Sequence, residues 1–210
     1  MQTLVLADDR YHPAQIARTG LGALAECGFT FDWIENAGDW SAERLATYPV
    51  IVLVKANNVS ATDERKWMTP DIEMALTAHV RAGNGLFAIH SGTAGYREDL
   101  GLRRLLGGLF VRHPKQCPVT VEPVADHPLT AGSHPFTQMD EHYFMEMADE
   151  QVDCFLQTHS EHGVQPGGWT RTEGAGRVCV LTPGHNVEVW LDPAYQALIQ
   201  NGLRWCAKLI

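Results

Sequence analysis

Short runs of consecutive apolar residues alternate along this chain with segments whose apolar residues recur every three or four positions. The runs at 4–7, 49–54 and 86–89 are continuously apolar, as is typical of strands buried on both faces of a parallel sheet. Segments 13–27 and 70–82 each begin with a proline and carry their apolar side chains on one helical face. This alternation predicts an α/β fold with a mostly parallel sheet and helices on both faces.

The second half of the chain is less regular. A final helix is expected to begin at Asp192-Pro193, and a long, loop-rich insertion is expected between about 110 and 140. No internal repeat or linker separates the halves, so we expect a single domain over residues 1–210. Alternating or continuous apolar patterns predict further strands at 29–34, 118–123, 141–145, 152–156 and 177–181.

The composition of the chain excludes some classes of binding partner. The net charge of −9 argues against nucleic acid, whose phosphates require clustered Lys and Arg. No apolar run approaches the roughly 18 residues of a membrane span, and the N-terminus lacks the basic region of a signal peptide. The five cysteines are scattered and form no C-x-x-C pair, which suits a reducing compartment. We therefore expect a cytoplasmic protein without nucleic-acid or membrane partners.

A glycine-rich turn at the end of the 86–89 strand is the strongest local signal. In Gly85-Leu-Phe-Ala-Ile-His-Ser-Gly-Thr-Ala-Gly95 the apex residue is His90. The strand–turn–helix pattern resembles a nucleophile elbow, but an imidazole occupies the position of the usual Ser or Cys. The turn therefore points away from acyl-enzyme chemistry and towards acid–base, metal-binding or ligand-binding work.

Two further histidines follow predicted strands. His12 comes shortly after the first strand and His185 follows the strand at 177–181. Because parallel strands end at one edge of a sheet, His12, His90 and His185 are predicted to share the carboxyl edge, where α/β proteins bind ligands. Histidine titrates nearest to neutral pH, so it suits both proton transfer and metal ligation.

The segment Asp140-Glu141-His142-Tyr143 adds carboxylates, an imidazole and a phenol. Glu141 and His142 alternate across a predicted strand, so at most one of them should face the site. No H-E-x-x-H, H-x-H or paired C-x-x-C spacing is present, so no metal ligands are assigned. A Zn²⁺ site built from separate strand ends stays open as an alternative.

Several segments together resemble the ThuA-like family, the trehalose-utilisation group. No single segment is specific, but the ordered set extends over nearly the whole chain. It comprises Arg10-Tyr-His-Pro13, Gly85–Gly92, Leu106-Gly-Gly-Leu-Phe110, His113-Pro114, His127-Pro-Leu-Thr130, Pro135-Phe136, Asp140–Tyr143, Gly176-Arg-Val178, Gly184-His185 and Asn201-Gly-Leu-Arg-Trp205.

The resemblance implies a flavodoxin-like three-layer sandwich related to class I glutamine amidotransferases. It does not imply their activity, because His90 stands where the amidotransferase cysteine would be. It also implies a role in the catabolism of trehalose or related disaccharides, beside sugar dehydrogenases. A homodimer is a further expectation, from the exposed strand edges of the second half and the apolar last helix.

The leading hypothesis is acid–base hydrolysis, elimination or isomerisation of an oxidised (keto) sugar, whose carbonyl acidifies the neighbouring C–H bond. His90 would be the base, with His185 and Glu141 as acid or polarising group. Substrate would be bound by the remaining candidates, which are His12, Ser91, Gly92, His142 and Tyr143. Two alternatives are a Zn²⁺-dependent hydrolase that uses the same residues and a non-catalytic sugar-binding or regulatory subunit.

Overall fold

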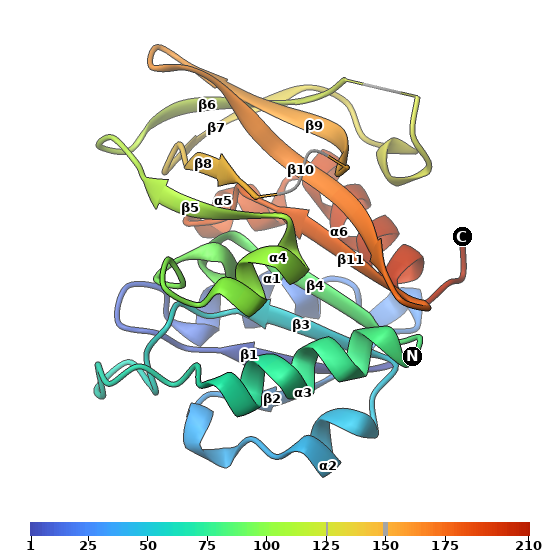
Figure 1. The fold of residues 1–210 in the computed structure, drawn as a ribbon. Helices are drawn as coiled ribbons and strands as arrows, with labels where there is room; N and C mark the ends of the chain where they lie inside the picture. Colours follow the sequence, from blue (N-terminus) through green and yellow to red (C-terminus); the bar gives the residue numbers. More distant parts are fainter. Residues whose placement is uncertain (125, 149–150) are drawn as a thin grey trace.

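A nine-stranded mixed sheet runs through the molecule (Figure 1). The computed structural model describes residues 1–124, 126–148 and 151–210. In spatial order the strands are β2 (Thr30–Ile34), β1 (Gln2–Ala7), β3 (Val50–Val54), β4 (Gly85–Ile89), β11 (Gly176–Leu181), β10 (Gly163–Glu173), β9 (Asp153–Ser160), β6 (Cys117–Pro123) and β7 (Phe136–Asp140).

The sheet has a parallel half and an antiparallel half that meet at β11. Strands β2, β1, β3, β4 and β11 run parallel to one another. Strand β10 pairs antiparallel with β11, and the pairs from β10 through β9 and β6 to β7 are antiparallel as well. Leu181 of β11 pairs with Ile89 of β4, so these two strands end side by side. A separate two-stranded sheet joins β5 (Gly108–Arg112) to β8 (Phe144–Met147).

Helices cover both faces of the parallel half (Figure 1). On one face α1 (Ala14–Gly22), α5 (Val187–Leu191) and α6 (Pro193–Cys206) bury a core around Phe87 and Trp190. On the other, α2 (Ala42–Ala46), α3 (Pro70–Arg81) and α4 (Leu100–Leu106) pack on Leu53 and Leu86. Because β3 and β4 are buried on both faces, their side chains are continuously apolar.

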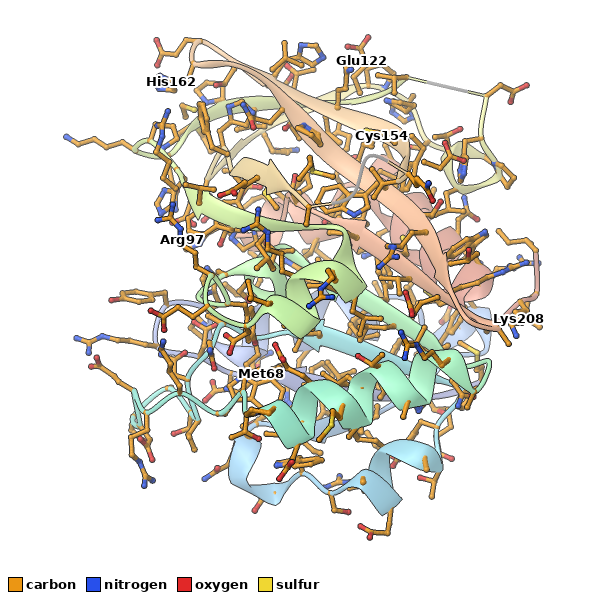
Figure 2. All side chains as sticks on the ribbon, viewed as in Figure 1. Met68, Arg97, Glu122, Cys154, His162 and Lys208 are labelled. Carbon is orange, nitrogen blue, oxygen red and sulfur yellow. The ribbon has the colours of Figure 1, made fainter. Side chains whose placement is uncertain are left out.

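The predicted α/β alternation and parallel sheet are confirmed, and no helix in the described ranges is long and apolar enough to cross a membrane. Within the expected loop-rich insertion at 110–140, the strand predicted at 118–123 is confirmed as β6. The rest of the expectation is wrong in part, because this segment also contains strand β7 and the short 3-10 helix Pro128–Thr130. Figure 2 shows His162 at the tip of the long β9–β10 hairpin. The helix expected over 13–27 ends at Gly22.

The strand order places a crossover point between β1 and β3. The chain leaves β1 for β2 on one side, then returns to β3 on the other. At such a point the loops that leave neighbouring strands diverge and open a crevice at the carboxyl edge, where ligands bind in open α/β sheets. The segments that follow β1, β3, β4 and β11 all begin at this edge.

Candidate functional site: a three-histidine, one-carboxylate cluster

Four side chains from distant parts of the sequence converge at this edge. His12, His90, Glu141 and His185 each offer one ligand atom, and these atoms lie within 4.8 Å of one another. They surround one carboxylate oxygen, Glu141 Oε2. It lies 3.2 Å from His185 Nδ1, 3.5 Å from His90 Nε2 and 4.0 Å from His12 Nε2.

His90 is held at the apex of the turn by an unusual backbone conformation. Its φ is +46°, in the left-handed region that side chains other than glycine rarely adopt. A Cβ at Gly92 would lie 2.0 Å from the carbonyl oxygen of Leu53, so only glycine lets the turn pack this closely on β3. The ring of His90 is 1% exposed, and its Nδ1 lies 2.8 Å from the carbonyl oxygen of Thr182. Because a carbonyl only accepts, Nδ1 carries the proton and Nε2 presents a lone pair to the cluster.

His12 is oriented by Asp9, the second residue after β1. The His12 Nδ1 lies 2.8 Å from Asp9 Oδ1 and 3.0 Å from Oδ2. Burial raises the pKa of Asp9, but its hydrogen bonds and the charge of His12 outweigh burial and leave that pKa below its ordinary value. Burial in turn lowers the pKa of His12 despite Asp9. His12 therefore donates from Nδ1 to a carboxylate and turns the Nε2 lone pair towards Glu141.

Glu141 comes from the antiparallel half, directly after β7. The preceding Asp140 is 1% exposed and accepts hydrogen bonds from the backbone N–H groups of Gly184 and His185, both at 2.8 Å. This bridge fixes the end of β7 against the loop after β11. It thereby sets Glu141 beside the His185 ring.

Charge and burial shift the pKa values of Glu141 and His185 in opposite directions. Burial raises the pKa of Glu141, but His185 and His90 outweigh it and hold that pKa well below its ordinary value. The Glu141 carboxylate, 3.2 Å from His185 Nδ1, raises the pKa of His185 in spite of burial. Glu141 is therefore ionised at neutral pH and draws positive charge towards itself.

The cluster contains acceptors that face one another. His12 Nε2, His90 Nε2 and His185 Nδ1 are buried, and none makes a hydrogen bond to the described residues. For His12 and His90 these atoms are lone pairs, directed at the anionic Glu141 oxygen. Such an arrangement is unfavourable unless a cation lies between the groups.

A divalent metal ion fits this donor set. Three imidazoles and one carboxylate are ligands that Zn²⁺ accepts, and bonds of about 2.0–2.1 Å give ligand-to-ligand edges of about 3.3–3.4 Å in a tetrahedron. The 3.2 and 3.5 Å separations around Glu141 Oε2 bracket those edges, whereas 4.0 Å is wider. The hydrogen bonds from His12 to Asp9 and from His90 to the Thr182 carbonyl are the outer contacts that orient metal-ligating histidines.

A cavity of about 640 Å³ opens beside the cluster. Tyr143 lies between His90 and Phe110, with ring centroids 4.0 and 4.1 Å away. His113 Nε2 lies 3.5 Å from Glu141 Oε1, the oxygen turned away from the three histidines. The cavity is lined by Tyr11, His12, Ala56, Asn57, Asn58, Ala94, Gly95, Phe110, His113, Glu141, Tyr143 and His185.

The predicted site residues divide into two groups. His12, His90, Glu141, Tyr143 and His185 meet at the carboxyl edge. The remaining candidates do not line the 640 Å³ cavity. These are His142, whose ring nitrogens contact Ser160 and Thr158, Ser91, which is fully buried behind His90, and Gly92, which packs against β3.

His142 was expected to bind substrate, and the structure places it elsewhere. Its side chain is 1% exposed, with Nδ1 2.6 Å from Ser160 Oγ and Nε2 3.1 Å from Thr158 Oγ1. Residues 141–143 lie between β7 and β8 and form no strand, although one was expected at 141–145. Of the two neighbours only Glu141 reaches the cluster, whereas His142 packs against β9.

The sequence analysis gave no role to Asp9, and it named Asp140 and His113 only as parts of longer segments. Asp9 carries the same signal as His12, because it follows the first strand at the carboxyl edge. Asp140 immediately precedes Glu141, so its adjacency to a candidate was visible. His113 directly follows β5, and the position of β5 beside the cluster depends on its long-range pairing with β8.

The fold and this edge define an α/β protein with a histidine-rich candidate metal centre. The chain belongs to the ThuA family, described as trehalose utilisation, whose sequence profile matches residues 4–206. No curated protein sequence matches the chain.

Solved structures agree on the fold. A ThuA-like protein of Parabacteroides merdae superposes with a TM-score of 0.77 at 16% identity, covering 99% of this chain and 90% of that one. A cytoplasmic protein of Salmonella typhimurium superposes with a TM-score of 0.72 at 16% identity, covering 98% of this chain and 99% of that one. A glutamine amidotransferase of Thermotoga maritima superposes with a TM-score of 0.63 at 14% identity, covering 99% of this chain and 98% of that one. At these identities the similarity establishes the fold alone, and it agrees with the expected relation to glutamine amidotransferases.

Proposed function

We propose that this protein is a metal-dependent enzyme of carbohydrate catabolism that acts on a sugar derivative. The observation that carries the proposal is the set of buried, unpartnered ring nitrogens of His12, His90 and His185 around one oxygen of Glu141. The family description, trehalose utilisation, supports a sugar as the substrate class.

A bound Zn²⁺ would supply Lewis acidity towards a substrate oxygen in the adjoining cavity. The protein's own side chains orient the ligands and shape the cavity. Asp9 and the Thr182 carbonyl hold two imidazoles in the tautomer that leaves Nε2 free. Tyr143, stacked on His90, excludes water from one side of the cluster. His113, beside Glu141 Oε1, supplies an imidazole at the cavity wall in addition to those of the cluster.

A metal-free acid–base reaction on a keto sugar is the second candidate, and one observation favours it. His185 and Glu141 lie 3.2 Å apart, and Glu141 raises the pKa of His185. With its pKa raised, His185 would hold a proton more readily than a free imidazole and deliver it to a leaving oxygen or an enolate. His90 would then act as the base through its Nε2 lone pair.

Metal analysis of protein expressed without a histidine tag distinguishes the metal-dependent enzyme from the metal-free one. We expect close to one Zn²⁺ or similar ion per chain in the wild type, and a loss of at least 100-fold in affinity in His90→Ala and Glu141→Gln. His162→Ala, at the hairpin tip, is the matched control and should keep the metal. Metal-free protein that turns over keto-glucosides at the full rate would favour acid–base chemistry. Saturable sugar binding without turnover in either form would favour a non-catalytic subunit.

The expected domain organisation, location and oligomeric state are supported by separate observations. One continuous sheet with helices on both faces of its parallel half supports a single ThuA-like domain over 1–210, of the flavodoxin-like three-layer type. The Salmonella protein described as cytoplasmic supports a cytoplasmic location. Strand β7 is an edge of the sheet, which supports a homodimer. A sugar dehydrogenase as functional neighbour follows from the proposed keto-sugar chemistry.

A further inference from the structure

A second hollow, of about 390 Å³, lies where α3 and α4 pack side by side next to β10 (Figure 1). Its lining includes Thr77 and Arg81 of α3, Arg104 and Leu105 of α4, and Arg171 and Glu173 of β10. None of its lining residues belongs to the histidine cluster or lines the 640 Å³ cavity. The hollow is therefore a separate feature of the molecule.

The charge of this hollow is opposite to that of the whole chain. Three guanidinium groups and one carboxylate line it, which gives a net charge of +2, whereas the chain carries −9. Arginine stays protonated at any physiological pH, so the charge is permanent. Glu73 lies against the lining residue Gly101, and its Oε1 accepts from the backbone N–H of Leu102 at 3.0 Å. Even with this second carboxylate, the charge around the hollow stays positive.

Glu173 orients two of the three guanidinium groups. Its Oε1 accepts from Arg81 Nε at 2.7 Å, and its Oε2 accepts from Arg171 Nη2 at 3.3 Å. Arg171 Nη1 also donates to the carbonyl oxygens of Arg104 and Leu105 at the end of α4. With its side chain only 13% exposed, Arg171 is a fixed positive charge in the wall.

Arg81 and Arg104 have donors that a ligand can use. Arg81 bonds to Glu173 through Nε, and its two Nη groups make no hydrogen bond to the described residues. Arg104 is exposed, and its guanidinium makes no hydrogen bond or ion pair within the part of the chain that the structure describes. The adjacent Arg103, in contrast, does not line the hollow and is paired with Glu146 at 2.5 Å.

We infer that this hollow binds a small organic dianion, either a phosphate monoester or a dicarboxylate, between Arg81 and Arg104. Guanidinium groups hold phosphate and carboxylate oxygens through paired N–H donors. A phosphate monoester carries nearly two negative charges at pH 7, which matches the charge of the wall. The Thr77 hydroxyl adds a neutral donor, and Leu105 offers an apolar surface to the carbon skeleton. The volume lies within the range of small-molecule sites.

Calorimetric titration at constant ionic strength tests this inference. The probes are glycerol 3-phosphate and succinate, with glycerol as the uncharged control, on metal-loaded and on chelator-treated protein. We expect at least one dianion to bind once per chain with a Kd below about 1 mM, and glycerol not to bind in that range. Tighter binding of glycerol 3-phosphate would identify phosphate esters as the ligand class, and tighter binding of succinate would identify dicarboxylates. Binding of neither dianion would overturn the inference.

Variants place the bound dianion in the hollow. Arg104→Gln and Arg81→Gln should each weaken binding at least tenfold, and Arg104→Gln should leave thermal unfolding unchanged because its side chain is exposed. The control is Arg97→Gln, an exposed arginine before α4 that does not line the hollow (Figure 2), which should change binding less than twofold. Unchanged binding in both hollow variants would overturn the inference.

Glu141→Gln distinguishes this site from the histidine cluster, where a metal could itself hold an anion. We expect this variant to bind the dianion as the wild type does, because Glu141 does not line the hollow. Binding that is lost in Glu141→Gln but kept in Arg104→Gln would place the anion at the cluster and overturn the inference. Neither result bears on the proposed metal-dependent function, because that function is tested by metal content and turnover.

Discussion

Asp9 Oδ1 lies 2.8 Å from His12 Nδ1, and the same carboxylate also accepts backbone hydrogen bonds from its own loop and from the segment after β3. Its Oδ1 also accepts from the backbone N–H of Tyr11, and its Oδ2 accepts from the backbone N–H of Ala56 after β3. The carboxylate therefore links the ends of β1 and β3 and presents a fixed acceptor to the imidazole. A ring oriented in this way needs no rearrangement when a cation arrives.

Asp9→Asn should weaken Zn²⁺ binding by about 10–100-fold while leaving all four cluster residues in place. The amide keeps an acceptor but loses the charge that makes the His12 imidazole a better donor of electrons to a metal. Competition against a chromophoric chelator measures the affinity. The control is Asp32→Asn, a carboxylate bonded to Tyr48 and Gln2 away from the site. An identical loss in both variants would deny Asp9 its orienting role.

Gly92→Ala should destabilise the protein by about 2–3 kcal/mol or more, because the new Cβ meets a backbone carbonyl that has no room to move. That contact is to Leu53 at 2.0 Å. Gly22→Ala is the matched control, since a Cβ there has no neighbour within 4 Å. Urea unfolding of both variants measures the difference. A Gly92→Ala protein as stable as the wild type would mean that the turn does not pack on β3 as described.

His79 should make stability fall as the pH drops below neutral. Burial in α3 lowers its pKa from 6.5 to about 4, so the unfolded chain takes up the proton first. The contribution is present above pH 6.5 and is lost towards pH 4, a total of about 3 kcal/mol. Urea unfolding at several pH values should show a shallower dependence for His79→Leu. Parallel curves for variant and wild type would contradict this account.

Asp140→Ala should cost about 2–4 kcal/mol, because it leaves two buried N–H groups without an acceptor. These belong to Gly184 and His185. Asp192→Ala is an instructive comparison, since Asp192 caps α6 through Ala194 and also accepts a long hydrogen bond from Gln138, and its loss should cost about 1 kcal/mol. Thermal unfolding ranks the two. A smaller effect at Asp140 would show that β7 and the loop after β11 are held together by other contacts.

Sequence patterning predicted the parallel half because that half is governed by local rules. Continuously apolar runs such as 50–54 indicated buried strands, and shared strand polarity then placed His12, His90 and His185 on one edge. The antiparallel half was harder to predict from the sequence. Segment 110–140 contains many prolines and turn residues, yet its strands are stabilised by long-range pairing, such as Val121 with Thr158. Pairings of that kind leave no local pattern.

The candidate site was predictable to the same degree. The three histidines that follow parallel strands were found, but Asp9 after β1 was not, and the position of His113 after β5 depends on the long-range pairing of β5 with β8. The choice between Glu141 and His142 shows the limit most clearly. Alternation predicted that only one of them faces the cluster, but the choice is made by Asp140, which fixes the end of β7 against Gly184.

The cluster joins residues that lie far apart in the order of synthesis. His12 belongs to the first loop of the chain, whereas His185 follows the last strand of the sheet. During translation the ligand set stays incomplete until that strand has emerged from the ribosome and paired with β4. Glu141 further requires that the antiparallel strands have closed onto the parallel ones. Metal capture by a growing chain would thus mark the moment at which its two halves have docked, and truncated or misregistered chains would remain empty.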